Sequence, residues 1–281
     1  MKKMKLVSTY SDYGNPDMWD ANSSVKCVCD EHIWANKREG KQVLLLIEPR
    51  PIQPNVYEYA LEVADQYEYV FTHDSQLLAV LDNARPILWG GVWCRLEEID
   101  ITSINDKEKK YMIKEPKKTK LISMVSSDKE ECELHIERKR IARKYKDKID
   151  VYGTIDGGEF ADPIDTLRDY KYAVVIENYI DNIWFSEKLL NCFATKTIPI
   201  YYGARDIDEY FDGKGIIHCE SIEEVEKWID DILDNQGWYS DAYDYSKAFL
   251  DENYELSKKY ENFDEWLYKT YEKEIGGLFD E

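Results

Sequence analysis

The chain has 281 residues, of which 43% are hydrophobic and 14% aromatic, and this composition excludes an intrinsically disordered protein. The formal net charge of −20 argues against nucleic acid and anionic membrane surfaces as partners, because both are bound through lysine and arginine. The sequence contains no run of about 18 apolar residues, so we expect no integral membrane segment.

The N-terminus and the cysteines bear on cellular location. The opening residues MKKMKLVSTY carry charge with no apolar stretch behind them, so they do not indicate a secretory signal. The six cysteines are scattered through apolar segments, which favours reduced thiols and a cytoplasmic protein. Cys27, Cys29 and His32 could suggest a metal clip, but no second half with ligand spacing follows, so we interpret them as structural.

Short apolar strands alternate with helices through the first half of the chain. We expect strands at residues 4–9, 42–48, 69–72 and 86–89, an amphipathic, helix-like segment at 25–36, and helices beginning near residues 55 and 76. This alternation is typical of a parallel, doubly wound α/β sheet. The charged stretch 97–120 indicates a linker.

The second half repeats the α/β pattern and ends in helices. Strands are expected at residues 120–125, 149–153, 172–176, 197–202 and 215–219, with helices at 135–148, after Ser186, and at 222–233. The Tyr-rich tail has a helical period, and we expect it to pack back on the body. We therefore divide the chain into an N-terminal Rossmann-like domain (1–115), a C-terminal domain (116–238) and a helical segment (239–281).

A βαβ unit at residues 171–203 carries the most informative polar residues. An apolar strand stops at Glu177 and Asn178, and Ser186 is placed to cap the following helix. Ligands of such units bind outside the carboxyl ends of the strands, near the helix N-terminus. Lys188 suits a phosphate, Glu187 and Glu177 can accept hydrogen bonds from hydroxyls, and Trp184 offers a flat apolar wall. This chemistry predicts a nucleotide-sugar pocket.

The same segment resembles the donor-binding region of the α-1,3-fucosyltransferases, glycosyltransferase family 10. The likeness lies in Glu-Asn after a strand, an aromatic residue, Ser-Glu-Lys opening a helix, and Thr-Ile-Pro-Ile ending in Tyr-Gly. Ten positions separate Asn178 from Lys188, which is also similar to the family. The resemblance implies a GT-B-like fold, two Rossmann-like domains facing across a cleft, with an acceptor-binding first domain and a donor-binding second one. It also implies GDP-fucose as donor and donor-binding roles for Glu177, Asn178, Trp184, Glu187 and Lys188.

A basic helix at residues 135–148 has two interpretations. It could display a solvated basic face, or one of its arginines could hold a diphosphate bidentately. The resemblance implies an early arginine followed by apolar residues three and seven positions later, which Arg138, Ile141 and Tyr145 match. Arg140 and Arg143 are the alternatives. Further residues expected at the same edge are Ser126, Ser127, Tyr152 and Gly153, whereas Gly157 and Gly158 indicate a flexible turn.

Transfer with inversion needs one base to take the proton of the acceptor hydroxyl. Glu48 ends the most apolar strand of the first half, where partial burial would raise its pKa. It also resembles the acidic residue of the family, although Ile-Glu-Pro replaces the usual Gly-Glu-Asn. A structural alternative pairs Glu48 with Arg50, and Asp74 or His73 are alternative bases.

The sequence thus predicts an inverting glycosyltransferase that moves L-fucose from GDP-fucose to a saccharide hydroxyl. No metal is expected, because Arg138, Lys188 and a helix N-terminus would neutralise the leaving group, and Asp206 and Asp208 lie in the wrong place for a ligand pair. Two alternatives remain, a transferase of another nucleotide sugar and a non-catalytic nucleotide- or carbohydrate-binding protein. The expected partners are the donor and a saccharide acceptor.

Overall fold

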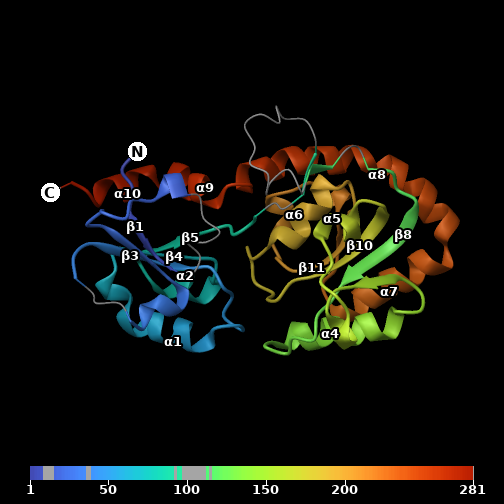
Figure 1. Cartoon of the computed structure of the whole chain (residues 1–281), viewed down its shortest axis with the longest axis horizontal. Helices are drawn as coiled ribbons and strands as arrows, with labels where there is room; N and C mark the ends of the chain where they lie inside the picture. The colour runs from blue at the N-terminus through green and yellow to red at the C-terminus, as the bar shows by residue number, and fades with distance from the viewer. Residues whose placement is uncertain (9–15, 36–38, 92–93, 97–111, 114–115, 281) are drawn as a thin grey trace. The chain divides into compact units, whose positions relative to one another are not determined.

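The computed structural model describes residues 1–8, 16–35, 39–91, 94–96, 112–113 and 116–280. Contacts group the chain into two compact units, Met1–Trp89 with Asn262–Glu281, and Gly90–Glu261. Each unit is built on a five-stranded parallel sheet (Figure 1). The expected α/β class with two Rossmann-like units is therefore confirmed, whereas the expected division into domains at residues 115 and 238 stays a prediction.

The sheet of the first unit is wound in chain order. Its strands are β1 (Lys5–Val7), β2 (Lys26–Cys29), β3 (Gln42–Leu46), β4 (Tyr69–Thr72) and β5 (Ala84–Pro86), each parallel to the next. Its helices are α1 (Pro54–Val63), α2 (Ser75–Val80), α9 (Phe263–Thr270) and α10 (Glu272–Gly277). The winding direction never reverses along this sheet, so the first unit has no topological switch point.

The two faces of this sheet carry separate cores, because successive side chains of a strand point to opposite sides. Leu44 and Leu46 pack with the buried side of α1, whereas Val43 and Leu45 pack with Leu267 of α9. The C-terminal helices thus cover the face opposite α1 (Figure 1). The expected packing of C-terminal helices back on the body is confirmed for α9 and α10.

The sheet of the second unit reverses its winding. Its strands are β8 (Lys120–Val125), β9 (Asp150–Tyr152), β10 (Tyr170–Ile176), β11 (Ile198–Tyr202) and β12 (Ile217–His218), in the spatial order β12-β11-β10-β8-β9. The chain runs outward from β8 to β9 and then crosses back past β8 to β10. The carboxyl ends of β8 and β10 therefore flank a topological switch point, where open α/β sheets bind ligands. In a separate pair, β6 (Arg95–Leu96) lies parallel to β7 (Met112–Ile113).

Helices cover both faces of the second sheet (Figure 1). Right-handed crossovers place the helices before and after the reversal on opposite faces. The helices are α4 (Glu133–Tyr145) and α7 (Ile222–Asp234) on one face, and α5 (Pro163–Leu167) and α6 (Glu187–Ala194) on the other, where α8 (Gln236–Ser257) packs on α6. Short 3-10 helices are η2 (Pro16–Met18), η3 (Asp30–Ile33), η4 (Ala64–Gln66), η6 (Ile155–Gly157), η7 (Ile207–Glu209), η8 (Gly213–Gly215) and η9 (Lys258–Tyr260).

Two predicted elements of the first half are wrong. Residues 25–36 were expected to be helix-like, but they contain strand β2 followed by η3. The reason is that β2 buries Cys27, Val28 and Cys29 between β1 and β3, and this tertiary pairing outweighs local helix propensity. The strand expected at 86–89 lies at Ala84–Pro86 instead. Most of the predicted linker, residues 97–111 and 114–115, lies outside the described residues.

All six cysteines are free and buried, as expected for reduced thiols. Among the described residues, no helix combines the length and the apolar character that crossing a membrane requires.

Candidate functional site

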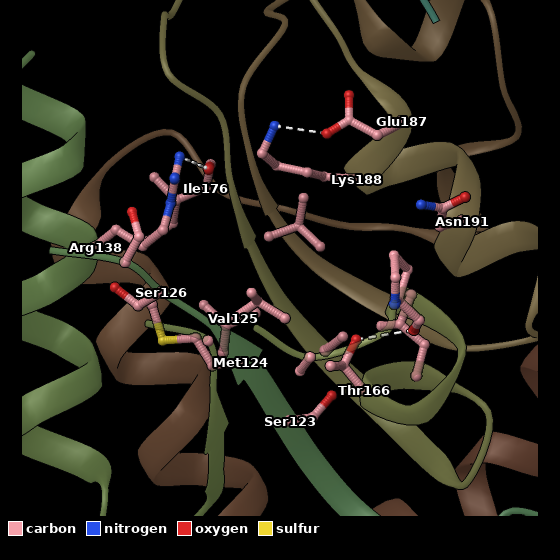
Figure 2. A pocket seen from close by; sticks show the side chains of 18 of the residues that line it. Ser123, Met124, Val125, Ser126, Arg138, Thr166, Ile176, Glu187, Lys188 and Asn191 are labelled. Atoms are coloured by element: carbon pink, nitrogen blue, oxygen red, sulfur yellow. Dashed lines mark hydrogen bonds and ion pairs between the residues drawn. The ribbon is translucent and has the colours of Figure 1, made fainter. Parts of the chain in front are cut away.

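A cavity of about 300 Å³ opens at the switch point of the second unit. Its walls come from the carboxyl ends of β8 and β10, the segment after β9, and helices α4, α5 and α6 (Figure 2). The lining residues with polar side chains are Ser123, Ser126, Ser127, Arg138, Thr154, Thr166, Glu187, Lys188 and Asn191. The cavity therefore opens at the sheet edge where the sequence predicts a ligand site, and it is lined by some of the predicted residues, namely Ser126, Arg138, Gly153, Glu187 and Lys188.

Arg138 projects from α4 into this cavity and is only 9% exposed. Its Nη2 donates to Asn178 Oδ1 at 2.8 Å and to the Ile176 carbonyl, while its Nε has no hydrogen-bond partner among the described residues. Burial lowers the pKa of Arg138 because it penalises the charged form. A buried cation with an unused donor is a good receptor for an anionic group.

The other arginines of α4 point away from the cavity. Arg140 binds Glu137 at 2.8 Å and Glu226 at 2.9 Å. Arg143 binds Asp156 at 2.6 Å. Both side chains are about half exposed, so they form the solvated basic face that the sequence allowed. Arg138 is the arginine that the structure brings to the cavity.

Lys188 enters the cavity from the first turn of α6. Its Nζ lies 3.1 Å from Glu187 Oε1, 3.1 Å from Ser186 Oγ and 3.8 Å from Glu177 Oε2. Burial disfavours the ammonium, but the carboxylates of Glu187 and Glu177 outweigh burial and raise the pKa of Lys188. In Figure 2 the charged ends of Lys188 and Arg138 lie at the same end of the pocket.

Glu177 lies behind the wall of the cavity and does not line it. The side chain is fully buried; its Oε1 accepts from the Ser186 backbone N–H at 2.9 Å and its Oε2 from Ser186 Oγ at 2.7 Å. Burial raises the pKa of Glu177, and the charge of Lys188 opposes the shift. Glu177 thus fixes the N-terminus of α6 and, through it, the position of Lys188.

Asn178 and Trp184 also lie outside the lining. Asn178 Oδ1 accepts from Arg138 and lies 3.1 Å from His135 Nε2, so Asn178 orients the guanidinium. Trp184 is buried. His135 was missed by the sequence analysis, although its spacing of three residues from Arg138 puts both on one helix face. Burial, and then the charge of Arg138, lower the pKa of His135.

The loops after β8 and β9 meet at the cavity. Ser126 is buried there, and its Oγ has no hydrogen-bond partner among the described residues. Gly153 has φ +100°, and a Cβ on it would lie 2.1 Å from the Ser126 carbonyl oxygen, so a larger residue would force the two loops apart. Tyr152 turns its side chain away to Tyr170, with 2.6 Å between the hydroxyls, and does not line the cavity.

A second wall of the cavity was missed by the sequence analysis. It comes from the segment after Gly153, which contains η6 where a flexible turn was expected, and from α5. Its residues are Thr154, Phe160, Ala161, Pro163, Thr166 and Leu167. Asn191 also lines the cavity, and its spacing of three from Lys188 on α6 was a usable signal.

Glu48 belongs to the first unit and lies two residues after the end of β3. Its side chain is exposed, where partial burial was expected. Its backbone N–H lies 3.3 Å from Asp30 Oδ1, and its carbonyl accepts from Tyr57 Oη at 2.6 Å.

The alternatives to Glu48 are engaged elsewhere. Arg50 forms two 2.7 Å bonds to the carboxylate of Asp74, which also caps α2 by accepting from the Leu77 backbone N–H. Asp74 and His73 are fully buried. Neither is placed to meet a hydroxyl arriving from solvent.

The sequence of this chain matches a family model described as glycosyltransferase family 10 (fucosyltransferase) C-term over residues 115–267, which is more than half of its length. The chain belongs to glycosyltransferase family 10. It is therefore a glycosyltransferase. The matched region contains every lining residue of the cavity, whereas Glu48 lies outside it.

Solved structures share the fold of this family 10 chain at low sequence identity. An α1,3-fucosyltransferase with GDP is 14% identical, with a TM-score of 0.54 and coverage of 95% of this chain and 80% of that one. The α1,3-fucosyltransferase with GDP-fucose is also 14% identical, with a TM-score of 0.53 and coverage of 94% of this chain and 80% of that one. A pneumococcal O-GlcNAc transferase, GtfA, in complex with UDP and GlcNAc is 10% identical, with a TM-score of 0.51 and coverage of 91% and 57%. A search of curated proteins finds no significant match.

Metal binding was not expected from the sequence. In the described part of this family 10 chain, no group of three or more His, Cys, Asp or Glu side chains is arranged to hold a metal ion. The expectation that transfer needs no metal stays a prediction.

Proposed function

We propose that the protein is an inverting fucosyltransferase that moves L-fucose from GDP-fucose to a saccharide hydroxyl. The observation that carries the proposal is the pair of cations, Arg138 and Lys188, lining one cavity at the switch point of a family 10 chain. GDP-fucose as donor is supported by the family match and by a fold shared with an α1,3-fucosyltransferase with GDP-fucose.

In this proposal the second unit binds the donor. The unused Nε of Arg138 and the ammonium of Lys188 take the diphosphate, where a guanidinium fork and a point charge suit phosphate oxygens. The Ser126 hydroxyl, also without a partner in the described structure, adds a neutral donor. The apolar wall around Phe160 and Leu167 covers an uncharged part of the nucleotide.

The first unit supplies the base. Glu48 takes the proton of the acceptor hydroxyl while the oxygen of that hydroxyl forms a bond to C1 of fucose. The bond between C1 and the phosphate oxygen breaks, and GDP leaves with the electron pair from the opposite face, which inverts the configuration. Arg138 and Lys188 stabilise the charge that develops on the diphosphate, so the proposal needs no bound metal.

The donor is tested by incubating the protein with a panel of nucleotide sugars and measuring release of the nucleotide diphosphate. We expect slow hydrolysis of GDP-fucose alone. Turnover of a different donor would establish a transferase of another nucleotide sugar, and turnover of none would favour a binding protein without catalysis.

The base is tested separately with Glu48→Gln. This change keeps the side-chain size and removes the proton acceptor, so we expect transfer to fall about 10²- to 10⁴-fold with unchanged affinity for GDP measured by calorimetry. Transfer at the wild-type rate would place the base elsewhere.

A further inference from the structure

The main chain of Glu48 is held by side chains from two other elements of the first unit. Asp30, at the start of η3, has its Oδ1 2.8 Å from the Ile47 backbone N–H and 3.3 Å from that of Glu48. Tyr57, from the first turns of α1, donates its hydroxyl to the Glu48 carbonyl at 2.6 Å. The peptide groups on both sides of the Glu48 Cα are therefore fixed.

The Asp30 carboxylate is an unusual group for a purely structural contact. It is 7% exposed, in an acidic chain with ample surface for carboxylates. Its backbone has φ +46°, in the left-handed region that residues other than glycine seldom adopt. Strained, buried polar residues of this kind persist where the surrounding structure imposes them, and they concentrate at functional sites.

Tyr57 is itself held in place by a buried polar network. His73 Nε2 lies 3.2 Å from Tyr57 Oη and 3.2 Å from the Ile47 carbonyl oxygen. The Arg50 guanidinium lies over the Tyr57 ring at 4.8 Å and is fixed by its two bonds to Asp74. Arg50 follows the carboxyl end of β3, and His73 and Asp74 follow that of β4. The network supports Tyr57 and, through it, the peptide groups that flank the Glu48 Cα.

We propose that Asp30 and Tyr57 are positioning residues for Glu48, holding its peptide so that the carboxylate leaves the end of β3 in one fixed direction. The inference rests on the proposed role of Glu48 as base. A reacting group must be held within a fraction of an ångström of its productive position, and residues behind it provide that precision. His73 and Asp74, which the sequence offered as alternative bases, take part as supports of Tyr57.

The kinetic test uses the full chain and GDP-fucose, with water in place of the acceptor and GDP release as the signal. Asp30→Ala removes the acceptor of two backbone N–H groups, and we expect kcat to fall about 10- to 100-fold with little change in the donor KM. Tyr57→Phe keeps the ring beneath Arg50 and loses the hydroxyl that bonds to the Glu48 carbonyl and to His73 Nε2, so we expect kcat to fall about 5- to 10-fold. Asp30→Asn keeps an acceptor oxygen and should restore most of the rate.

A double-mutant cycle separates positioning from general destabilisation. In a Glu48→Gln background, Asp30→Ala should cause no further loss, because there is no base left to position. The matched control is Asn83→Ala, which removes bonds to the Ala64 and Tyr67 carbonyls in the same unit. It should lower the melting temperature and leave kcat unchanged.

A measurement independent of activity completes the test. Amide hydrogen exchange at residues 47 and 48 should quicken at least about tenfold in Asp30→Ala, since both N–H groups lose their partner. Unchanged exchange, or additive losses in the cycle, would overturn the inference. Asp30→Asn as inactive as Glu48→Gln would make Asp30 the base itself. Failure of the proposed function shows differently, as a wild-type protein that releases no GDP.

Discussion

In the proposed function, Arg138 is the residue on which donor binding depends most. Its burial and its unused Nε mean that an incoming phosphate gains a charge-assisted bond without competition from a carboxylate in contact among the described residues. We therefore predict that Arg138→Met weakens GDP binding about 100-fold or more, as expected when one partner of a buried charge pair is removed. Calorimetric titration with GDP measures this directly.

The matched control is Arg140, two residues further along the same helix. Arg140→Met removes an equally basic side chain that is paired with Glu137 and Glu226 on the surface. Its effect on GDP affinity should be under about threefold, because surface ion pairs contribute little and act over a short range. Equal losses in both variants would mean that the helix attracts GDP through its overall charge, with no specific contact from Arg138.

The burial of Asp30 also leads to a prediction about how stability depends on pH. Burial, together with the nearby charge of Glu48, raises the pKa of Asp30 to about 7 against hydrogen bonds from Ile47, Cys29 and Glu48 that lower it. The folded state then favours the protonated form of Asp30. The contribution of Asp30 to the free energy of unfolding is therefore complete at low pH and is lost as the pH rises from about 4 to about 7. In the described part of the chain, Cys29 and Cys27 are further titratable groups that interact with Asp30.

The pH prediction is tested by comparing urea unfolding of the wild type and of Asp30→Asn. The wild type should lose stability relative to the variant by up to about 1.4 kcal/mol per pH unit across that window, because the amide does not titrate. Above pH 8 the two curves should run parallel. Parallel curves across the whole range would show that Asp30 titrates normally.

At the scale of elements, the entry to α6 determines where Lys188 lies. Ser186 Oγ accepts from the Lys188 backbone N–H at 3.4 Å and donates to buried Glu177, so the helix start is tied to the end of β10. We predict that Ser186→Ala lowers the free energy of unfolding by about 1–2 kcal/mol. It should also weaken GDP binding about 5- to 10-fold, since Lys188 Nζ loses a partner at 3.1 Å.

Ser221 provides the control for that prediction. It caps α7 in the same unit, accepting from the Glu224 backbone N–H at 3.2 Å, and does not line the cavity. Ser221→Ala should cost about 1 kcal/mol of stability and leave GDP affinity unchanged. If both variants weaken GDP binding alike, the effect comes from stability and not from the position of Lys188.

Elements whose burial is visible in local composition could be predicted from the sequence. Strands β3, β4, β8, β10 and β11 are apolar runs that fit strands buried on both faces, and all were expected within a few residues. Strand β2 has only four residues, Lys26–Cys29, and becomes a strand because its neighbours pair with it. Pairing between distant segments leaves no local signal, so the sequence alone favoured a helix there.

Some residues of the candidate site could likewise be predicted from the sequence, and others could not. Residues that follow a strand or open a helix, such as Ser126, Gly153 and Lys188, were expected at the cavity because parallel strands bring their carboxyl ends together. Glu177 was assigned to the ligand, yet full burial makes it a support. The wall at Phe160 and Leu167 depends on how the segment after β9 folds over the sheet, which no motif in that segment indicates.

For the whole molecule, winding explains why the cavity of the candidate site lies at the strand ends of the second unit. The second sheet reverses between β8 and β10 and opens a cavity there, whereas the first sheet winds in one direction and offers single residues at its strand ends. The first unit is also completed by the distant end of the chain. Met4 donates its backbone N–H to Tyr268 Oη at 3.0 Å, and Leu267 is 0% exposed beneath the sheet.

The C-terminal helices should therefore stabilise the first unit as core elements and not as an appended tail. Leu267→Ala leaves a cavity beside Val43 and Leu45, and we predict a loss of about 2–5 kcal/mol in the free energy of unfolding. Leu61→Ala makes the same chemical change on α1, where the side chain is 44% exposed, and should cost under about 0.5 kcal/mol. Urea unfolding of both variants measures the difference. Only a buried leucine leaves unfilled volume when it is truncated. Similar small losses in both variants would therefore mean that Leu267 of α9 is not part of the core of the first unit.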